Sequence, residues 1–173
     1  MKQNITWKRL LVAAGSFLAL IIFDQWTKAL AVANLMNQEP FVLIDGVFQL
    51  HYLENRGAAF GMMQGKQSFF IIMSLAACLI IGWLYFKLPW KKRFHPLRGS
   101  LLFIAAGAVG NLIDRILLGY VVDFFYFELI DFPIFNVADI YVTCATVLLA
   151  VLILFVYKEE ELEGLFSGKK EKS

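Results

Sequence analysis

The sequence contains few of the residues from which disulfide-rich and zinc-bound folds are built. Its 173 residues include two cysteines and two histidines, too few for a disulfide framework or a four-ligand zinc site. Charged residues make up 17% of the chain, against about a quarter in an average soluble domain. The net charge of +2 is too small to indicate a nucleic acid partner. The composition therefore also argues against a disordered chain and an ordinary soluble enzyme.

Apolar residues make up most of what is present, at 60% hydrophobic and 16% aromatic, so lipid is the expected solvent. Four stretches lack Asp, Glu, Lys and Arg, namely 10–23, 67–86, 99–113 and 140–157. Because a helix needs about 20 residues to cross a bilayer, the first and third must continue past charged residues. We expect an all-α membrane protein, one domain over 1–173, with a four-transmembrane-helix bundle. Its expected spans are about 9–33, 67–87, 98–118 and 137–157, followed by a charged tail at 158–173.

The distribution of lysine and arginine predicts the orientation. Placing both termini and the loop between the second and third spans in the cytoplasm puts most of the sixteen basic residues there, as the positive-inside rule requires. The exceptions are Lys28, Arg56, Lys66 and Arg115. We therefore expect a multi-pass membrane protein with both termini in the cytoplasm and residues 34–66 and 119–135 facing outward. We expect a monomer in contact with membrane lipid.

The two outward segments differ in pattern. Residues 41–53 alternate around Asp45-Gly46, which predicts a hairpin in a small extracytoplasmic β-sheet. Residues 119–133 are too apolar for a free loop. We expect a short outward-facing helix or a mobile lid bounded by Gly119 and Pro133, with a permanently packed interfacial segment as the alternative.

This topology brings aspartates from distant parts of the sequence to the outer end of the bundle. Ionisable groups at this depth are costly unless they are paired or wet, so each is a functional candidate. Asp24 and Lys28 lie four residues apart on one helix, which predicts an ion pair with Lys28 snorkelling outward. Asn111 and Arg115 also share a face, so we expect them to hold a substrate carbonyl. Asp114 points elsewhere and either braces another helix or joins a structural ion network.

Asp123 and Asp139 are the candidates for acid and base. Asp139 has a structural explanation as well, because Asn136 before the fourth span predicts a capping box with it. Asp123 lies among Val and Phe residues, and an apolar setting beside a second carboxylate favours its neutral form. Two carboxyls that share a proton supply a general acid and a general base. No metal or cofactor is expected, because two acids without His or Cys form a poor metal site.

Two other functions remain open from the residues alone. Buried acids also form proton or ion relays, but a relay needs ionisable steps across the membrane, and the inner halves of these spans lack them. A non-catalytic assembly subunit would tolerate replacement of the acids.

Five short blocks carry a resemblance to a known family. They are DQWTK at 24–28, NRGAAFG at 55–61, GNLIDR at 110–115, VVDF at 121–124 and FNVAD at 135–139. In order and spacing they resemble the lipoprotein signal peptidases (signal peptidase II), membrane aspartic peptidases of bacteria.

The resemblance implies an aspartic endopeptidase acting on diacylglyceryl-modified prolipoproteins. Cleavage immediately before the lipid-bearing Cys would release the signal peptide. The resemblance makes Asp123 and Asp139 the catalytic dyad. The residues it places along the substrate site are Asn55, Asn111, Arg115 and Asn136. Those it places in support are Asp24, Lys28, Gly57 and Asp114.

Overall fold

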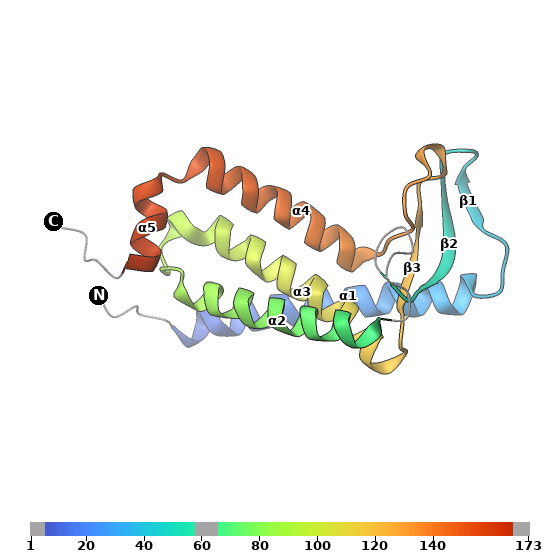
Figure 1. Cartoon of the computed structure of the whole chain (residues 1–173), viewed down its shortest axis with the longest axis horizontal. Helices are drawn as coiled ribbons and strands as arrows, with labels where there is room; N and C mark the ends of the chain where they lie inside the picture. Colours follow the sequence, from blue (N-terminus) through green and yellow to red (C-terminus); the bar gives the residue numbers. More distant parts are fainter. Residues whose placement is uncertain (1–5, 58–65, 168–173) are drawn as a thin grey trace.

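The computed structural model describes residues 6–57 and 66–167 and shows a helical bundle with a small sheet at one end (Figure 1). The long helices are α1 (Trp7–Leu35), α2 (Gln67–Lys87), α3 (His95–Leu117) and α4 (Val137–Val151). A 3-10 turn, η2 (Lys92–Phe94), precedes α3, and a π-helical turn, η4 (Leu152–Val156), extends α4. Among the described residues, four helices are long and apolar enough to span a membrane. They coincide with the four predicted spans to within a few residues.

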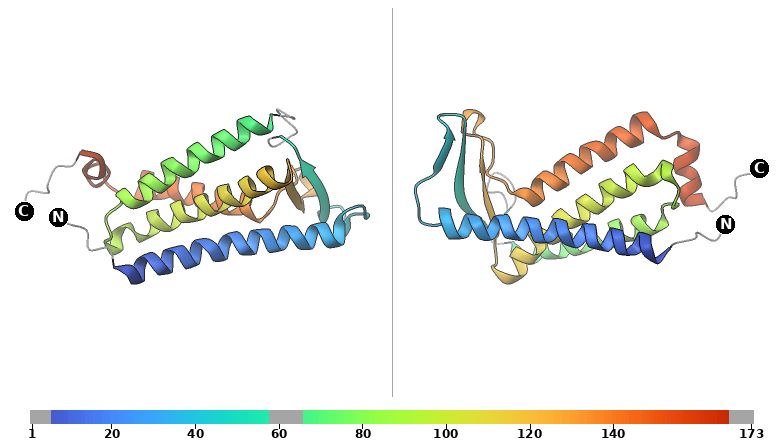
Figure 2. Two further views of the ribbon diagram at one scale, coloured as in Figure 1. Left: turned by 90° about the horizontal axis from the view of Figure 1, so that it is seen from below. Right: turned by 180° about the vertical axis from the view of Figure 1, so that it is seen from behind.

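Helix α3 lies at the centre of the bundle and packs against α1, α2 and α4 (Figure 2). The small residues of α3 permit the approach of α4. A Cβ atom added to Gly107 would lie 2.8 Å from Val142 Cγ2 and still closer to the Ala138 carbonyl oxygen. The small residues of α3 therefore allow the close helix packing that is typical of membrane bundles.

The sheet has three antiparallel strands in the order β1 (Phe41–Ile44), β2 (Phe48–Asn55) and β3 (Val121–Tyr126). The predicted hairpin forms β1 and β2. The register of β2 and β3 sets Leu53 opposite Asp123 and Asn55 opposite Val121. The sheet therefore brings the second outward segment onto the first.

The second outward segment differs from the expected lid. Its first half is strand β3, with Val121, Val122 and Phe124 buried, and the Phe124 and Phe125 amides donate to the Phe135 carbonyl. Strand β3 is therefore paired on both sides, and the expected mobility of 119–133 as a lid stays a prediction. The short outward-facing helix that we expected is the 3-10 turn η3 (Glu128–Ile130).

The beginning of the tail is also more ordered than predicted. Residues Glu159–Ser167 form helix α5, and Leu162 and Leu165 pack against a cluster that includes Leu88, Phe94 and Tyr157. The apolar residues among the charges therefore anchor the helix, and a fully solvated tail is wrong for this part. Residues 168–173 lie outside the described part.

We predict that Gly107→Ala lowers the free energy of unfolding by roughly 1–3 kcal/mol, since the new methyl group overpacks the contact of α3 with α4. Gly15→Ala is the matched control, because nothing lies within 4 Å of a Cβ at that position. Thermal unfolding in detergent micelles measures both. Equal stability of the two variants would contradict the close packing at Gly107.

Candidate active site

A buried ion triad joins α1 to α3 near the sheet. Lys28 Nζ lies 3.0 Å from Asp24 Oδ2 and 2.9 Å from Asp114 Oδ2. The predicted pair of Asp24 and Lys28 is present, but Lys28 does not snorkel outward, since its side chain is only 3% exposed. The second carboxylate holds it inside the protein.

Both acids of the triad also bind the backbone of neighbouring elements. Asp24 Oδ1 accepts from the Ala138 amide of α4 at 2.9 Å, and Asp114 Oδ2 accepts from the Val122 amide of β3 at 3.2 Å. Asp114 therefore braces a neighbouring element, which is strand β3 and not the helix that we expected. It also belongs to an ion network, as the other interpretation predicted. The triad fixes the start of α4 and the strand that carries Asp123.

Gln25 belongs to this network and was not predicted. Its Nε2 atom donates to Asp114 Oδ1 at 2.9 Å and to the Gly110 carbonyl at 3.1 Å. An uncharged polar residue inside a predicted span is the signal that could have identified it, because such a group needs partners in lipid.

Asn111 connects the ion triad to the candidate dyad through hydrogen bonds. Its Oδ1 accepts from Lys28 Nζ at 2.9 Å and from Asn136 Nδ2 at 3.0 Å, while its Nδ2 donates to Asp139 Oδ1 at 2.8 Å. Every polar atom of this amide is therefore occupied within the protein. Because Nδ2 has a second hydrogen, the expectation that Asn111 and Arg115 together hold a substrate carbonyl stays a prediction.

Asp139 occupies the third position of α4 and takes part in the predicted capping box. The Asp139 amide donates to Asn136 Oδ1 at 3.0 Å, and the Asn136 amide donates to Asp139 Oδ2 at 3.2 Å. Each of its carboxylate oxygens thus has a donor, one from Asn111 and one from the cap. Capping and a chemical role are compatible in this residue.

Asp123 is the more deeply buried acid, with 1% exposure. Its oxygens accept from Asn136 Nδ2 at 2.7 Å and from Asn55 Nδ2 at 2.9 Å. Burial, and secondly the charge of Asp139, raise the pKa of Asp123 to about 7. The sequence placed these two acids together, and their electrostatic coupling agrees with that placement.

Two predicted site residues prove to be positioning groups. Asn136 has no exposed surface. Its side-chain Nδ2 atom donates to Asp123 Oδ1, Asn111 Oδ1 and the Val122 carbonyl. Asn136 therefore bonds to both the dyad and its support, and the expected contact of Asn136 with substrate stays a prediction. Gly57 donates its amide to Asn55 Oδ1 at 3.0 Å, which turns the Asn55 amide nitrogen toward Asp123. The remainder of the NRGAAFG block, from residue 58, lies outside the described residues.

Arg115 lies beside the dyad and, among the described residues, uses few of its hydrogen-bond donors. Its Nη1 atom donates weakly to the Asn111 carbonyl at 3.4 Å, and its guanidinium lies 5.2 Å from the ring centre of Phe70, a neighbour that was not predicted. Since a guanidinium has five donors, it can still bind an acceptor. In the described part of the chain, no group of three or more His, Cys, Asp or Glu side chains could hold a metal ion.

These features define a class of protein. The site has two neighbouring carboxyls that are held by amides at one end of a bundle of membrane-spanning helices. Such a site is typical of a membrane hydrolase that uses acid–base catalysis.

Comparisons with known proteins identify the family. The model of signal peptidase (SPase) II matches residues 16–155. The lipoprotein signal peptidase of Streptococcus thermophilus (strain CNRZ 1066) is 46% identical over 84% of this chain and 92% of its own length. That of Enterococcus faecalis (strain ATCC 700802 / V583) is 39% identical over 93% of this chain and 96% of its own. A solved bacterial membrane enzyme, 29% identical, covers 100% of this chain and 98% of its own with a TM-score of 0.71. The chain belongs to the signal peptidase II family and is an aspartic peptidase.

We predict that Lys28→Met lowers the free energy of unfolding by about 3–5 kcal/mol, because it leaves two buried carboxylates without their cation. Glu54→Gln is the control, since Glu54 and Arg56 form an exposed ion pair at 2.7 Å whose loss costs less than about 1 kcal/mol. Denaturation followed by circular dichroism measures both. Adding Asp114→Asn to Lys28→Met should restore part of the loss. Equal effects of the two single changes would remove the triad from its structural role.

Proposed function

We propose that the protein cleaves the signal peptide from diacylglyceryl-modified prolipoproteins, immediately before the lipid-bearing Cys. Relatives that are 46% and 39% identical over nearly their whole length are lipoprotein signal peptidases. The observation that carries the proposed chemistry is that both carboxyls bond to Asn136, since its Nδ2 donates to Asp123 Oδ1 and its backbone amide donates to Asp139 Oδ2. Besides the substrate and water, the proposed reaction uses only side chains of this chain.

Asp139 acts as the general base. It is the third residue of α4, where the helix dipole favours a negative charge, and it accepts from Asn111 Nδ2 and the Asn136 amide. The Asp139 carboxylate takes a proton from water while the water oxygen attacks the carbonyl carbon of the scissile bond.

Asp123 acts as the general acid, because its raised pKa of about 7 leaves a substantial fraction of it protonated near neutral pH. It gives its proton to the carbonyl oxygen as the tetrahedral intermediate forms. When that intermediate collapses, Asp139 protonates the departing nitrogen, the C–N bond breaks, and Asp123 recovers its proton from the hydroxyl. Both carboxyls then return to their starting states.

Arg115 and Asn55 are the substrate-facing groups in this proposal. Arg115 has donors available for a peptide carbonyl or a lipid-linked ester. The Asn55 amide lies between β2 and Asp123, so a peptide lying along the sheet would pass beside it. The two acyl chains of the substrate would remain in the outer leaflet while the scissile bond reaches the dyad. Under this proposal the site lies at the outer surface of the bacterial cytoplasmic membrane, and both termini lie in the cytoplasm.

A proton relay is the weaker proposal for the same acids. Helix α3 has no Asp, Glu, Lys or Arg between Arg98 and Asp114. A cavity beside this stretch is lined almost entirely by apolar side chains. A proton therefore has no succession of ionisable groups to follow from the dyad to the other end of the bundle.

We predict that Asp123→Asn and Asp139→Asn each reduce cleavage at least about 10²–10⁴-fold, because an amide cannot exchange the proton. A gel-shift assay with a diacylglyceryl-modified prolipoprotein and purified enzyme measures the rate. Asp45→Asn, in the exposed turn before β2, is the matched control and should cleave normally. Full turnover by either dyad variant would remove that residue from the mechanism.

The same variants separate activity from folding. Because the pKa of Asp123 rises from 3.8 to about 7 in the fold, its contribution to stability decreases as the pH rises through that window. Asp123→Asn should therefore be at least as stable as the parent protein at pH 8. A large loss of stability would show that the charge of Asp123 supports the fold.

We predict that cleavage declines above about pH 7. Below the raised pKa of Asp123, about 7, the pair carries one proton, and above it both acids are ionised and no general acid remains. Asn55→Ala removes a donor that stabilises the Asp123 anion, so the declining limb should move to higher pH. A profile that stays flat to pH 9 would contradict the assignment of Asp123 as the acid.

A further inference from the structure

The end of the bundle away from the dyad has a second polar site that the proposed reaction does not use. A cavity of about 560 Å³ lies between the start of α1 and the start of α3. Four Lys, Arg or His side chains line it, namely Lys8, Arg9, His95 and Arg98, and none of its lining residues is Asp or Glu. The cavity therefore has the charge to attract an anion.

Arg98 is the most unusual member of this cavity. Its side chain is 5% exposed, and among the described residues its Nε and Nη1 atoms have no hydrogen-bond partner. Its Nη2 donates to the Leu88 carbonyl at 2.6 Å, and its guanidinium lies 3.6 Å from the centre of a ring of Trp90. A buried cation without a carboxylate is costly unless an anion neutralises it.

Exposed donors lie beside this buried charge. Arg9 and Lys8 are exposed on the first turn of α1, and Arg9 Nη1 also donates to the Trp90 carbonyl at 3.2 Å. Repulsion between Arg9 and Arg98, which line the same cavity, is relieved by an anion between them. Buried Trp90 Nε1 is a further donor without a partner in the described part of the chain.

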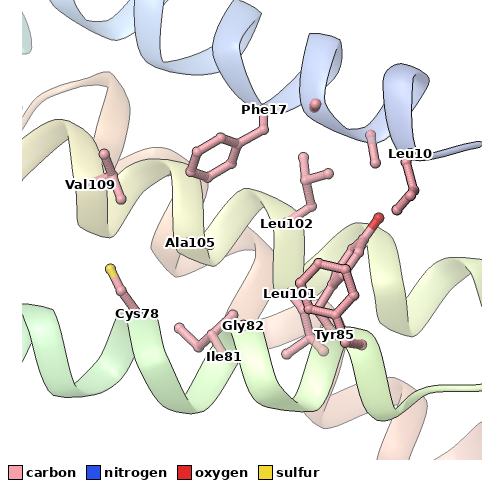
Figure 3. A pocket seen from close by; sticks show the side chains of 13 residues that line it. Leu10, Phe17, Cys78, Ile81, Gly82, Tyr85, Leu101, Leu102, Ala105 and Val109 are labelled. Carbon is pink, nitrogen blue, oxygen red and sulfur yellow. The ribbon is translucent and has the colours of Figure 1, made fainter. Parts of the chain in front are cut away.

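An apolar groove continues from the basic cavity into the membrane. It has a volume of about 410 Å³ and lies between α1 and α2, with α3 as its floor. Figure 3 shows Phe17 of α1 and Ile81 of α2 on its two sides. Ala13, Tyr85 and Leu102 line both spaces, so the two are continuous. From His95 to Val109, at 1.5 Å per residue, the combined space follows α3 for about 20 Å.

We propose that this space binds one anionic glycerophospholipid, with its phosphate among Arg9, Lys8 and Arg98 and an acyl chain in the groove. A basic pocket between helices at a bilayer surface is the expected form of a phospholipid head-group site. The apolar continuation of the cavity distinguishes a lipid from a free phosphate, which would leave the groove unoccupied. The site is separate from the dyad, and the proposal does not depend on the reaction assigned to it.

Native mass spectrometry of the purified protein tests this site by titration with phosphatidylglycerol or phosphatidylcholine. We expect one retained phosphatidylglycerol per chain, bound at least about tenfold more tightly than phosphatidylcholine. The double change Lys8→Gln/Arg9→Gln should weaken phosphatidylglycerol binding about tenfold or more, and Arg98→Gln should do the same if it folds. Lys158→Gln, an exposed lysine outside both spaces, is the matched control and should bind normally.

A second pair of variants tests the acyl chain. Gly82 lines the groove and has open space around an added Cβ, so Gly82→Leu should fill the groove and weaken phosphatidylglycerol binding. Gly15→Leu, with equally open space but no place in either lining, should not. Inorganic phosphate should raise the unfolding temperature less than phosphatidylglycerol does. Equal effects of the two ligands, unchanged binding in the double variant or in Gly82→Leu, or a dimer that excludes lipid, would overturn the proposal.

Discussion

The arrangement of the site depends on one buried cation. Lys28 Nζ lies within 3.0 Å of a carboxylate from its own helix and within 2.9 Å of one from α3, and it also donates to Asn111. An isolated ammonium group in such a place would lose its hydration without compensation. With two carboxylates and an amide around it, the charge instead fixes the relative positions of α1 and α3. The same two carboxylates accept backbone amides of α4 and β3, so four elements are positioned by one cluster.

The dyad is built on this cluster in a second layer of neutral amides. Asn111 relays the position of Lys28 to Asp139, and Asn136 connects Asn111 to Asp123. Amides can donate to the acids without adding charge, so Asp123 is positioned while burial still favours its protonated form. A lysine or arginine in place of Asn136 would position the acid equally well but would stabilise its anion. The neutral amides thus fix the positions of the acids without adding a positive charge that would stabilise the Asp123 anion.

The sequence predicted the helices and the grouping of acids because both follow from strong local rules. Uncharged apolar runs indicate spans, and the alternation of spans puts Asp24, Asp114, Asp123 and Asp139 at one end. The capping box of Asn136 and Asp139 could be read from their spacing alone. In contrast, strand β3 could not be predicted, since an apolar segment of that length pairs only when a partner strand such as β2 is available. Its pairing depends on contacts between residues about 70 apart in the sequence, such as Leu53 and Asp123.

The roles of individual polar residues were harder to predict for a related reason. Helical spacing gives the face on which Asn111 lies, but not how many partners surround that face. Three residues, Lys28, Asn136 and Asp139, supply these partners, so both polar atoms of the Asn111 amide are bonded inside the protein. The same holds for Lys28, whose length would allow snorkelling if Asp114 were absent. In a membrane, where unsatisfied polar groups are costly, buried polar side chains bind one another before they bind substrate. A residue in such a bundle is therefore a stronger candidate for substrate contact when it has more hydrogen-bond donors than partners within the protein. Among the predicted site residues, Arg115 meets this condition most clearly.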